Sequence, residues 1–263
     1  MAIENINVKQ YHVEDLDSGS KILTVEEHNE NICELAEKIF VDENSLGKGK
    51  TAEVFTVPGV TNVCCKKLGG ELKAINSFDE EAEFLEFARD IDDDSVIIPT
   101  PIATIEVQKK KKMKNLQGKT VVANVKEHAF LMKEIDGFSI EDILERRVKD
   151  PQSFLEGFDI DKFFSVLDSF IKKMHKSKHR VHHRDLHGGN IMINRTDFKP
   201  VVIDFGHAVS AYGEDSDIYN AEVFELDYNG INRRVSRILP NDLLKIKQVK
   251  SQLLEEMERL TNI

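Results

Sequence analysis

The sequence predicts an α+β protein of two lobes, in which strand-like patterns give way to helix-like patterns near Ile135–Gly137. Before this point, short stretches rich in Val, Ile, Thr and Phe are bounded by Gly, Pro or Lys, which is typical of strands. After it, apolar residues recur at helical spacing. A chain of 263 residues can form one sizeable core or two small lobes. We therefore expect an N-terminal extension at 1–44, a strand-rich lobe at 45–135 and a helical lobe at 136–263.

The strand-rich lobe is expected to contain one main helix. Phe78, Ala82 and Leu85 fall on one face of a helix over Phe78–Arg89. A further helix is expected over 27–40, whereas residues 1–26 are polar and suggest an arm or cap. The expected strands are Ala52–Val57, Asn62–Leu68, Ile102–Val107, Thr120–Val125 and His128–Ile135.

The helical lobe begins with a recognisable start signal. Ser139 and Asp142 fit the N-terminal cap of a short helix. A long apolar stripe between Ile160 and Met174 predicts a helix packed into a core. The remaining expected elements are strands at Asn190–Asn194 and Val201–Ile203 and a last helix with Leu243, Ile246, Leu253, Met257 and Leu260 on one side.

Charge argues against a nucleic-acid partner. The net charge is −11 and the pI about 5.4, whereas binding to a nucleic-acid backbone depends on an excess of Lys and Arg. The main basic cluster, Lys109–Lys112 with Lys114, is expected at an exposed hairpin tip. The longest apolar run, Ala129–Met132, is far too short to span a membrane. No secretory signal is apparent and three cysteines make no disulfide framework, so we expect a reducing, cytoplasmic setting.

Glycines in a turn between two expected strands form the first motif. Gly47 and Gly49, followed by Val54, match the pattern of a loop whose backbone can approach phosphate oxygens closely. Ala52 stands where the third glycine of the pattern would be.

A lysine on the next strand forms the second motif. Lys66 can pair with nucleotide phosphates if a carboxylate from a nearby helix holds it, and Glu81 is our choice for that carboxylate. The sequence leaves alternatives at both positions, with Lys67 competing for the first role and Glu80 or Glu83 for the second.

The third and fourth motifs are acidic. In His183-Arg-Asp-Leu-His-Gly-Gly-Asn190, the carboxylate of Asp185 can accept the proton of a hydroxyl, and Asn190 can reach a magnesium ion. Asp204 begins Asp-Phe-Gly after an expected buried strand, where a carboxylate can bind the same kind of ion. A zinc site among the neighbouring histidines is disfavoured because cysteine partners and a helical His-x-x-x-His site with a carboxylate are missing.

These four motifs, in this order, resemble those of the protein kinase superfamily between Leu46 and Gly206. The resemblance implies a bilobal kinase-like fold, with a small antiparallel sheet and one main helix in the first lobe, and ATP and Mg²⁺ as cofactors. It implies that Lys66 holds the α- and β-phosphates, that Glu81 holds Lys66, and that Asp185 is the catalytic base. The remaining implied roles are magnesium binding by Asn190 and Asp204, and adenine binding at the hinge by Met132, Lys133, Glu134 and Ile135.

Several features depart from an ordinary protein kinase. His187 stands where Ser/Thr protein kinases usually have a lysine that helps to neutralise the transferring phosphate. No Ala-Pro-Glu-like tripeptide follows Gly206, and the chain to Ile263 is short for a full activation segment and late helices. The chain therefore resembles a compact, atypical member that is truncated after Asp-Phe-Gly. In this compactness it is similar to the RIO and Haspin groups.

The resemblance predicts an ATP- and Mg²⁺-dependent phosphotransferase acting on a hydroxyl, with Ser or Thr of a protein as the first choice of substrate. Arg184, directly before the catalytic aspartate, favours a protein substrate, whereas His187 and the short second lobe favour the alternative. That alternative is a small-molecule kinase of the aminoglycoside or choline kinase kind. A pseudokinase that works as a binding module is a third hypothesis, weakened by the retention of Lys66, Asp185 and Asp204.

Overall fold

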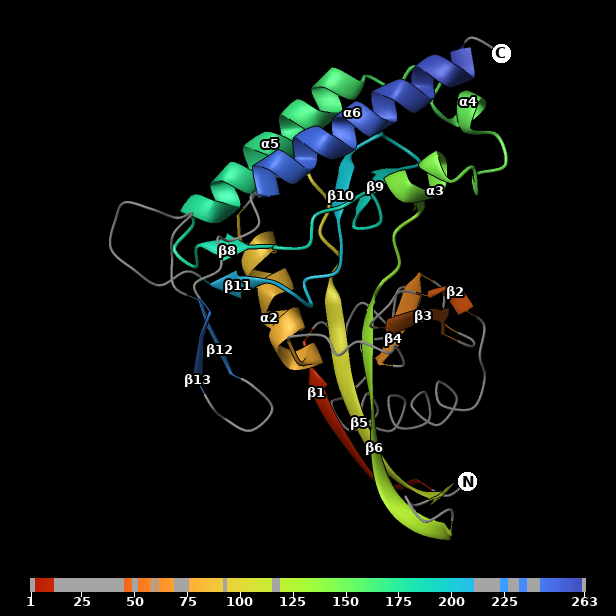
Figure 1. Ribbon diagram of the computed structural model, residues 1–263, viewed down its shortest axis with the longest axis vertical. Coiled ribbons are helices and arrows are strands. Elements are labelled where there is room, and N and C mark those ends of the chain that lie inside the picture. Colours follow the sequence, from red (N-terminus) through yellow and green to blue (C-terminus); the bar gives the residue numbers. More distant parts are fainter. Residues whose placement is uncertain are drawn as a thin grey trace, which may run out of the picture. The chain divides into compact units, whose positions relative to one another are not determined.

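The structure is a computed structural model (Figure 1). It describes the following parts of the chain: residues 3–11, 45–48, 52–57, 60, 62–68, 76–91, 94–114, 119–210, 223–226, 232–235 and 242–261. The helix expected over 27–40 lies outside them. Two compact units share the chain, one of Met1–Asp79 with Thr100–Glu134 and the other of Glu80–Pro99 with Ile135–Ile263. Helix α2 (Phe78–Arg89) has the bounds that its apolar spacing predicts and contributes residues to both units.

The first unit is built on one six-stranded antiparallel sheet with the strand order β1-β5-β6-β4-β3-β2. Figure 1 shows the two longest strands, β5 and β6, running side by side. The strands are β1 (Ile3–Gln10), β2 (Ser45–Lys48), β3 (Ala52–Thr56), β4 (Val63–Leu68), β5 (Pro101–Lys114) and β6 (Thr120–Lys133).

Both faces of this sheet are packed near the start of β5. On one face, Phe78 of α2 lies 5.7 Å from Phe130, measured between ring centroids, and the Thr104 hydroxyl donates to the Asp79 carboxylate. On the other face, apolar side chains of β4, β5 and β6 form the core cluster together with Val57, which follows β3. This cluster consists of Val57, Val63, Cys65, Ile102, Ala103, Ile105, Val107, Ala129 and Leu131. Burial on both faces agrees with the buried and mostly apolar start of β5, residues 101–105.

Strands β5 and β6 are longer than the sequence predicts. The break expected near Lys126 does not occur: the backbone pairing of β6 with β5 continues through this residue, and its ammonium lies 2.7 Å from the Glu106 carboxylate on the neighbouring strand. A ladder of backbone hydrogen bonds also continues through the lysine-rich end of β5, where strand pairing needs no buried side chain. Strand β1 falls where we expected a polar arm, and it pairs along β5 while Val8 packs against the core cluster.

The second unit is mostly helical and its helices begin at polar caps. Ser139 and Asp142 form a capping box at α3 (Ile140–Leu144), which confirms the predicted start signal. Asp150 caps the short helix α4 (Pro151–Phe154). Asp159 caps α5 (Ile160–Lys176), the helix predicted from the long apolar stripe.

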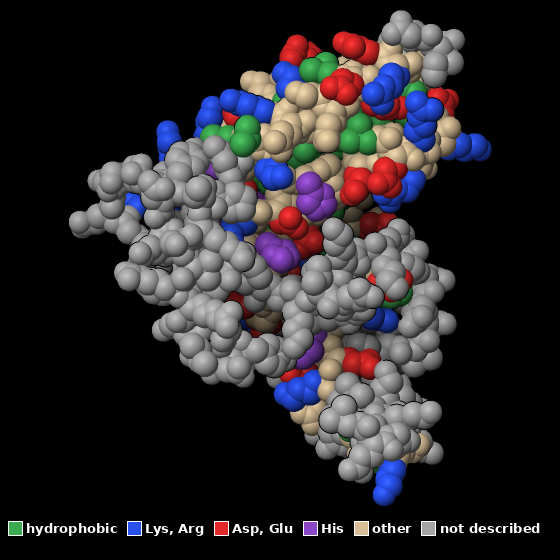
Figure 2. All heavy atoms as spheres, viewed as in Figure 1, with side chains coloured by type: hydrophobic (Ala, Val, Ile, Leu, Met, Phe, Trp, Pro, Cys, Tyr) green, Lys and Arg blue, Asp and Glu red, His purple; other side chains and the backbone are tan. Residues whose placement is uncertain are grey.

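Helix α5 packs against α6 (Asp242–Thr261), and the two lie alongside each other in Figure 1. The buried face of α5 carries Phe163, Phe164, Leu167, Phe170, Ile171, Met174 and His175, and that of α6 carries Asp242, Ile246, Val249, Leu253 and Glu256. Figure 2 shows Lys and Arg side chains interspersed with Asp and Glu over the end formed by α4, α5 and α6. One such pair joins Lys250 to Asp161 at 2.6 Å. No helix within the described ranges is long and apolar enough to cross a membrane.

Short ribbons complete the second unit. β7 (Gly137–Ser139), β9 (Ile191–Asn194) and β10 (Pro200–Val202) form a three-stranded sheet. Gly137 is required there, because a Cβ atom would lie 2.6 Å from the Ile193 carbonyl oxygen. β8 (Val181–His182) pairs with β11 (Val209–Ser210), and β12 (Val223–Leu226) pairs with β13 (Asn232–Val235). One sheet-rich unit and one helical unit confirm the predicted α+β class.

Candidate active site

The loop between β8 and β9 carries the residues predicted to perform chemistry. The Asn190 side-chain amide donates to the Asp185 backbone carbonyl at 2.9 Å and lies 3.4 Å from its carboxylate oxygen Oδ2. Asn190 is buried, whereas the side chain of Asp185 is 42% exposed. The loop thus presents one carboxylate to an incoming molecule while a buried amide fixes the backbone beneath it.

His183 joins this loop to the strand that precedes Asp204. Its ring is fully buried; Nδ1 accepts the backbone N–H of Asp185 at 3.3 Å, and Nε2 lies 2.9 Å from the Ile203 carbonyl oxygen. Because Nδ1 accepts, the proton lies on Nε2, which donates to Ile203. Burial lowers the pKa of His183, although the Asp242 carboxylate opposes the shift. A neutral, tautomerically fixed imidazole therefore sets the geometry of the loop.

Asp242, at the start of α6, anchors the same loop from another element. Its Oδ2 accepts the backbone N–H of His183 at 3.0 Å, and its Oδ1 accepts that of Arg184 at 3.0 Å. The His175 ring nitrogen Nε2 lies 2.9 Å from Oδ2. Burial raises the pKa of Asp242, but the hydrogen bond from His175 and the nearby histidines and backbone N–H groups outweigh it, so the pKa is lowered. The sequence contains no motif that points to Asp242, and we did not predict it.

Among the described residues, His175, His182 and Asp242 form a group whose potential ligand atoms lie within 4.8 Å of one another. Its geometry does not suit a metal ion. The two imidazole rings are stacked, with centroids 4.1 Å apart and planes 21° apart, so their in-plane lone pairs do not converge on one point. The Asp242 oxygens already accept the loop's N–H groups. We therefore assign this group to holding the loop.

Asp204 directly follows a residue that is hydrogen-bonded to Asn190. The backbone N–H of Ile203, its neighbour, donates to the Asn190 carbonyl at 3.1 Å. Asp204 has a φ of 61°, a left-handed conformation that is unusual outside glycine and frequent at functional sites. Its Oδ1 accepts the N–H of Gly206 at 3.3 Å. A carboxylate and an amide oxygen are hard oxygen donors, so the residues present fit Mg²⁺.

In the first unit, burial separates the two candidate lysines. Lys66 on β4 is 5% exposed, whereas Lys67 is half-buried with its ammonium 4.4 Å from the centroid of the Phe55 ring. Val54, also predicted to contact nucleotide, pairs with Lys66 in the β3–β4 ladder. A buried ammonium requires a compensating charge or ligand, so burial favours Lys66 for the phosphate role.

Burial also separates the candidate carboxylates on α2. Glu81 is 1% exposed, whereas Glu80 and Glu83 are exposed. The residues preferred from the sequence are therefore the buried ones: Lys66 among the two candidate lysines and Glu81 among the three candidate glutamates. Their mutual pairing stays a prediction.

The predicted glycine turn is described in part. Gly47 lies on β2 and pairs with Val54 on β3, while Gly49 lies outside the described residues.

The predicted hinge segment begins with the last two residues of β6 and continues beyond the strand. Met132 is half-buried and pairs with Cys64, and the next two backbone N–H groups are already engaged in the first unit. The N–H of Lys133 donates to Thr100 and that of Glu134 to Asn62. Ile135 is half-buried in the second unit.

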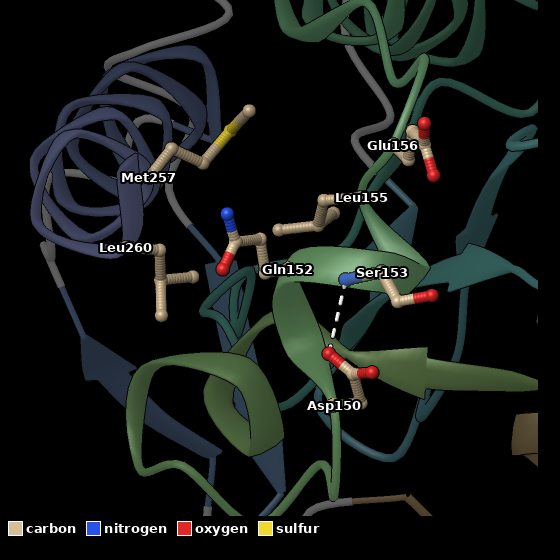
Figure 3. A pocket seen from close by; sticks show the side chains of 7 residues that line it. All are labelled: Asp150, Gln152, Ser153, Leu155, Glu156, Met257 and Leu260. Carbon is tan, nitrogen blue, oxygen red and sulfur yellow. Dashed lines mark hydrogen bonds between the residues drawn. The ribbon is translucent and has the colours of Figure 1, made fainter. Parts of the chain in front are cut away.

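A separate pocket lies between α4 and α6 in the second unit (Figure 3). Its lining consists of Asp150, Gln152, Ser153, Leu155, Glu156, Met257 and Leu260. The dashed line in Figure 3 is the 3.1 Å bond from the Ser153 N–H to the Asp150 cap. None of the predicted catalytic residues lines this pocket, so we do not place the chemistry there.

Comparison with known proteins gives a family and matches among solved structures. No curated protein matches the chain. The kinase PK-1 of Cydia pomonella granulovirus is similar in structure, with a TM-score of 0.41 and 14% sequence identity. The match covers 72% of this chain and 60% of the viral kinase. The model of the phosphotransferase enzyme family (APH) matches residues 49–212, more than half of the chain. The chain therefore belongs to the phosphotransferase enzyme family, within the protein-kinase-like superfamily.

Proposed function

We propose that this protein transfers the γ-phosphoryl group of ATP to a hydroxyl group, with Asp185 as the catalytic base. Membership of a phosphotransferase family supports the use of ATP. The observation that carries the proposal is the arrangement around Asp185, a half-exposed carboxylate whose backbone is held by the buried Asn190 amide at 2.9 Å. Such a group is accessible to a substrate and fixed in place, which is what a general base requires.

In the proposed reaction the acceptor oxygen forms a bond to the γ-phosphorus. The bond between that phosphorus and the β,γ-bridging oxygen breaks, and its electron pair leaves with ADP. The proton of the hydroxyl passes to the Asp185 carboxylate. Most of the catalysis in this chemistry comes from positioning and charge stabilisation, so the fixed loop around Asp185 is the important contribution of the chain.

Magnesium would be held by Asn190 and Asp204. Asn190 uses its amide N–H on the Asp185 carbonyl, which leaves its oxygen as the ligand atom. When bound, Mg²⁺ would neutralise phosphate charge and orient the γ-phosphoryl group. In the first unit the buried Lys66 would pair with the phosphates and Glu81 would hold that lysine.

The first choice of acceptor is Ser or Thr of a protein, as the Arg184-Asp185 pair suggests. A small-molecule hydroxyl is the second candidate, and the match to the phosphotransferase family model favours it. His187, in place of the usual lysine, also favours this second candidate.

One experiment tests the reaction and separates the two acceptors. The purified protein is incubated with γ-labelled ATP and Mg²⁺, once with a mixed protein extract and once with a panel of aminoglycosides, choline and sugars. We expect label on an acceptor, and the fraction that carries it identifies the class. Asp185→Asn should lower the transfer rate by about 100-fold or more while ATP affinity changes little. Transfer by this variant at the wild-type rate would contradict the assignment of the base.

A further inference from the structure

His187 lies in the catalytic loop, two positions after Asp185, and its ring accepts a hydrogen bond from the loop backbone. Its Nδ1 accepts the backbone N–H of Gly189 at 3.0 Å. A neutral imidazole has one accepting and one donating nitrogen, so the proton lies on Nε2. The loop backbone thereby selects which nitrogen of His187 can donate.

The donating nitrogen faces the predicted base. Nε2 of His187 lies 3.8 Å from Oδ2 of Asp185, and the side chains are 50% and 42% exposed. The Asn190 amide lies 3.4 Å from the same oxygen. Two side-chain nitrogen atoms thus lie near the same carboxylate oxygen, at 3.8 Å and 3.4 Å. Oδ1 is the oxygen that we expect to receive the substrate proton.

The ring of His187 is packed as well as hydrogen-bonded. A Cβ atom at Gly189 would lie 2.8 Å from Cε1 of the ring and would also clash with the Glu141 carboxylate. The backbone is fixed on both sides, since the Asn190 N–H donates to the His187 carbonyl at 2.9 Å and the Glu141 N–H to Gly188 at 3.0 Å. Glycine at 189 leaves room for the imidazole to lie against the loop.

We propose that His187 is a positioning residue that holds the Asp185 carboxylate through its Nε2–H. The inference rests on the proposed phosphotransferase function. The separation of 3.8 Å is longer than a hydrogen bond, and bonds of this kind often tighten only when substrate is bound. In the transfer, Oδ2 stays on the His187 and Asn190 donors while Oδ1 takes the hydroxyl proton, so the rotamer of the base is set before the reaction.

A competing explanation is that His187 only shapes the loop through Nδ1, and two substitutions separate the roles. The amide oxygen of His187→Asn can accept the Gly189 N–H, but this side chain is too short to reach Asp185. His187→Gln places an amide N–H near the position of Nε2 and gives up the Nδ1 contact. We expect kcat to fall by about tenfold to a hundredfold in His187→Asn, with little change in KM for ATP, and His187→Gln to recover most of that loss.

Three kinetic outcomes overturn the proposal: the reverse order of the two variants, equal losses in both, or wild-type kcat in both. A measurement without turnover is added, because it remains informative if the wild type transfers no phosphate. The ¹⁵N chemical shifts of the His187 ring should show the Nε2–H tautomer, and the Nδ1–H tautomer would refute the proposal. Loss of transfer in Asp185→Asn together with full activity in His187→Asn would overturn this inference alone and leave the proposed function standing.

Discussion

The two units hold their predicted site residues by different means. In the first unit Lys66 and Val54 are paired positions in a β ladder, and their placement follows from strand register and burial. In the second unit Asp185 lies on a loop whose shape depends on side chains that accept or donate backbone hydrogen bonds, above all Asp242 and His183. A ladder tolerates the loss of one side chain, whereas a loop of this kind depends on each of its anchors.

This difference separates two classes of substitution. Changes at the ladder positions should alter the interaction with nucleotide and leave the fold intact. Changes at the loop anchors should lower stability and activity together, because the same contacts maintain both.

The largest effect is expected for Asp242→Ala. The substitution leaves the buried backbone N–H groups of His183 and Arg184 without their acceptor and removes the partner of His175. We expect the free energy of unfolding to fall by about 3–5 kcal/mol, measured by urea denaturation, together with a loss of transfer activity. Asp242→Asn keeps one accepting oxygen, so its free energy of unfolding should fall by less than that of Asp242→Ala.

Asp161→Ala is the matched control for this experiment. Asp161 is also an aspartate near a helix N-terminus that pairs with the neighbouring helix, but its side chain is 82% exposed. Its removal should change stability by less than about 1 kcal/mol. If the two alanine variants lose the same free energy of unfolding, the hydrogen bonds of Asp242 to the loop do not contribute specifically to stability.

The next effect compares Lys66→Met with Lys67→Ala in the first unit. We expect Lys66→Met to lower kcat/KM for ATP by about 100-fold, because the buried ammonium is the predicted phosphate ligand. Lys67→Ala, which removes the half-buried lysine over Phe55, should stay within about twofold of the wild type. Both variants should keep the thermal midpoint within a few degrees. A larger kinetic loss in Lys67→Ala would assign the role to Lys67.

A smaller effect concerns pH and the buried histidine His182. Burial lowers its pKa to about 4, and the stacked His175 ring adds to the shift. The unfolded chain takes up this proton near pH 6.5. Stability should therefore decrease by about 2–3 kcal/mol as the pH falls from about 6.5 to about 4 and show no further loss from this group below that.

In denaturation experiments at several pH values, His182→Leu should reduce this pH dependence. The buried His183, whose pKa is also lowered, should account for a remaining part. His128→Gln, a change at an exposed histidine of the first unit, should preserve the pH dependence. Asp242 does not interfere in this range, because its lowered pKa confines its own loss of stability to pH values below about 4. If the free energy of unfolding of His182→Leu depends on pH as strongly as that of the wild type, other groups cause the dependence.

Local signals in the sequence predict much of this molecule. The apolar spacing of Phe78–Arg89, the capping pair Ser139 and Asp142, and the stripe of α5 each depend on residues a few positions apart, and the structure confirms them. The motif that contains Asp185 and Asn190 is equally local, and the structure places the Asn190 amide within hydrogen-bond distance of the Asp185 carbonyl.

The features that were missed depend on residues far apart in the chain. Asp242 accepts the N–H of His183, a residue 59 positions away in the sequence, and the spacing of apolar residues does not indicate such a contact. Strand β1 is polar and becomes a strand through its pairing with β5. The uninterrupted course of β6 accompanies its pairing with β5, which continues through Lys126 and Glu127. Each needs a partner that local patterns do not specify.

The anchoring of the catalytic loop by Asp242 also has a consequence for biosynthesis. During translation the ribosome adds His183 and Arg184 well before Asp242, which the contact separates by 59 and 58 positions. Until α6 has emerged from the exit tunnel and docked on α5, the two N–H groups have no carboxylate to receive them. A nascent chain arrested before residue 242 should therefore contain the complete His-Arg-Asp motif and still be unable to phosphorylate an acceptor.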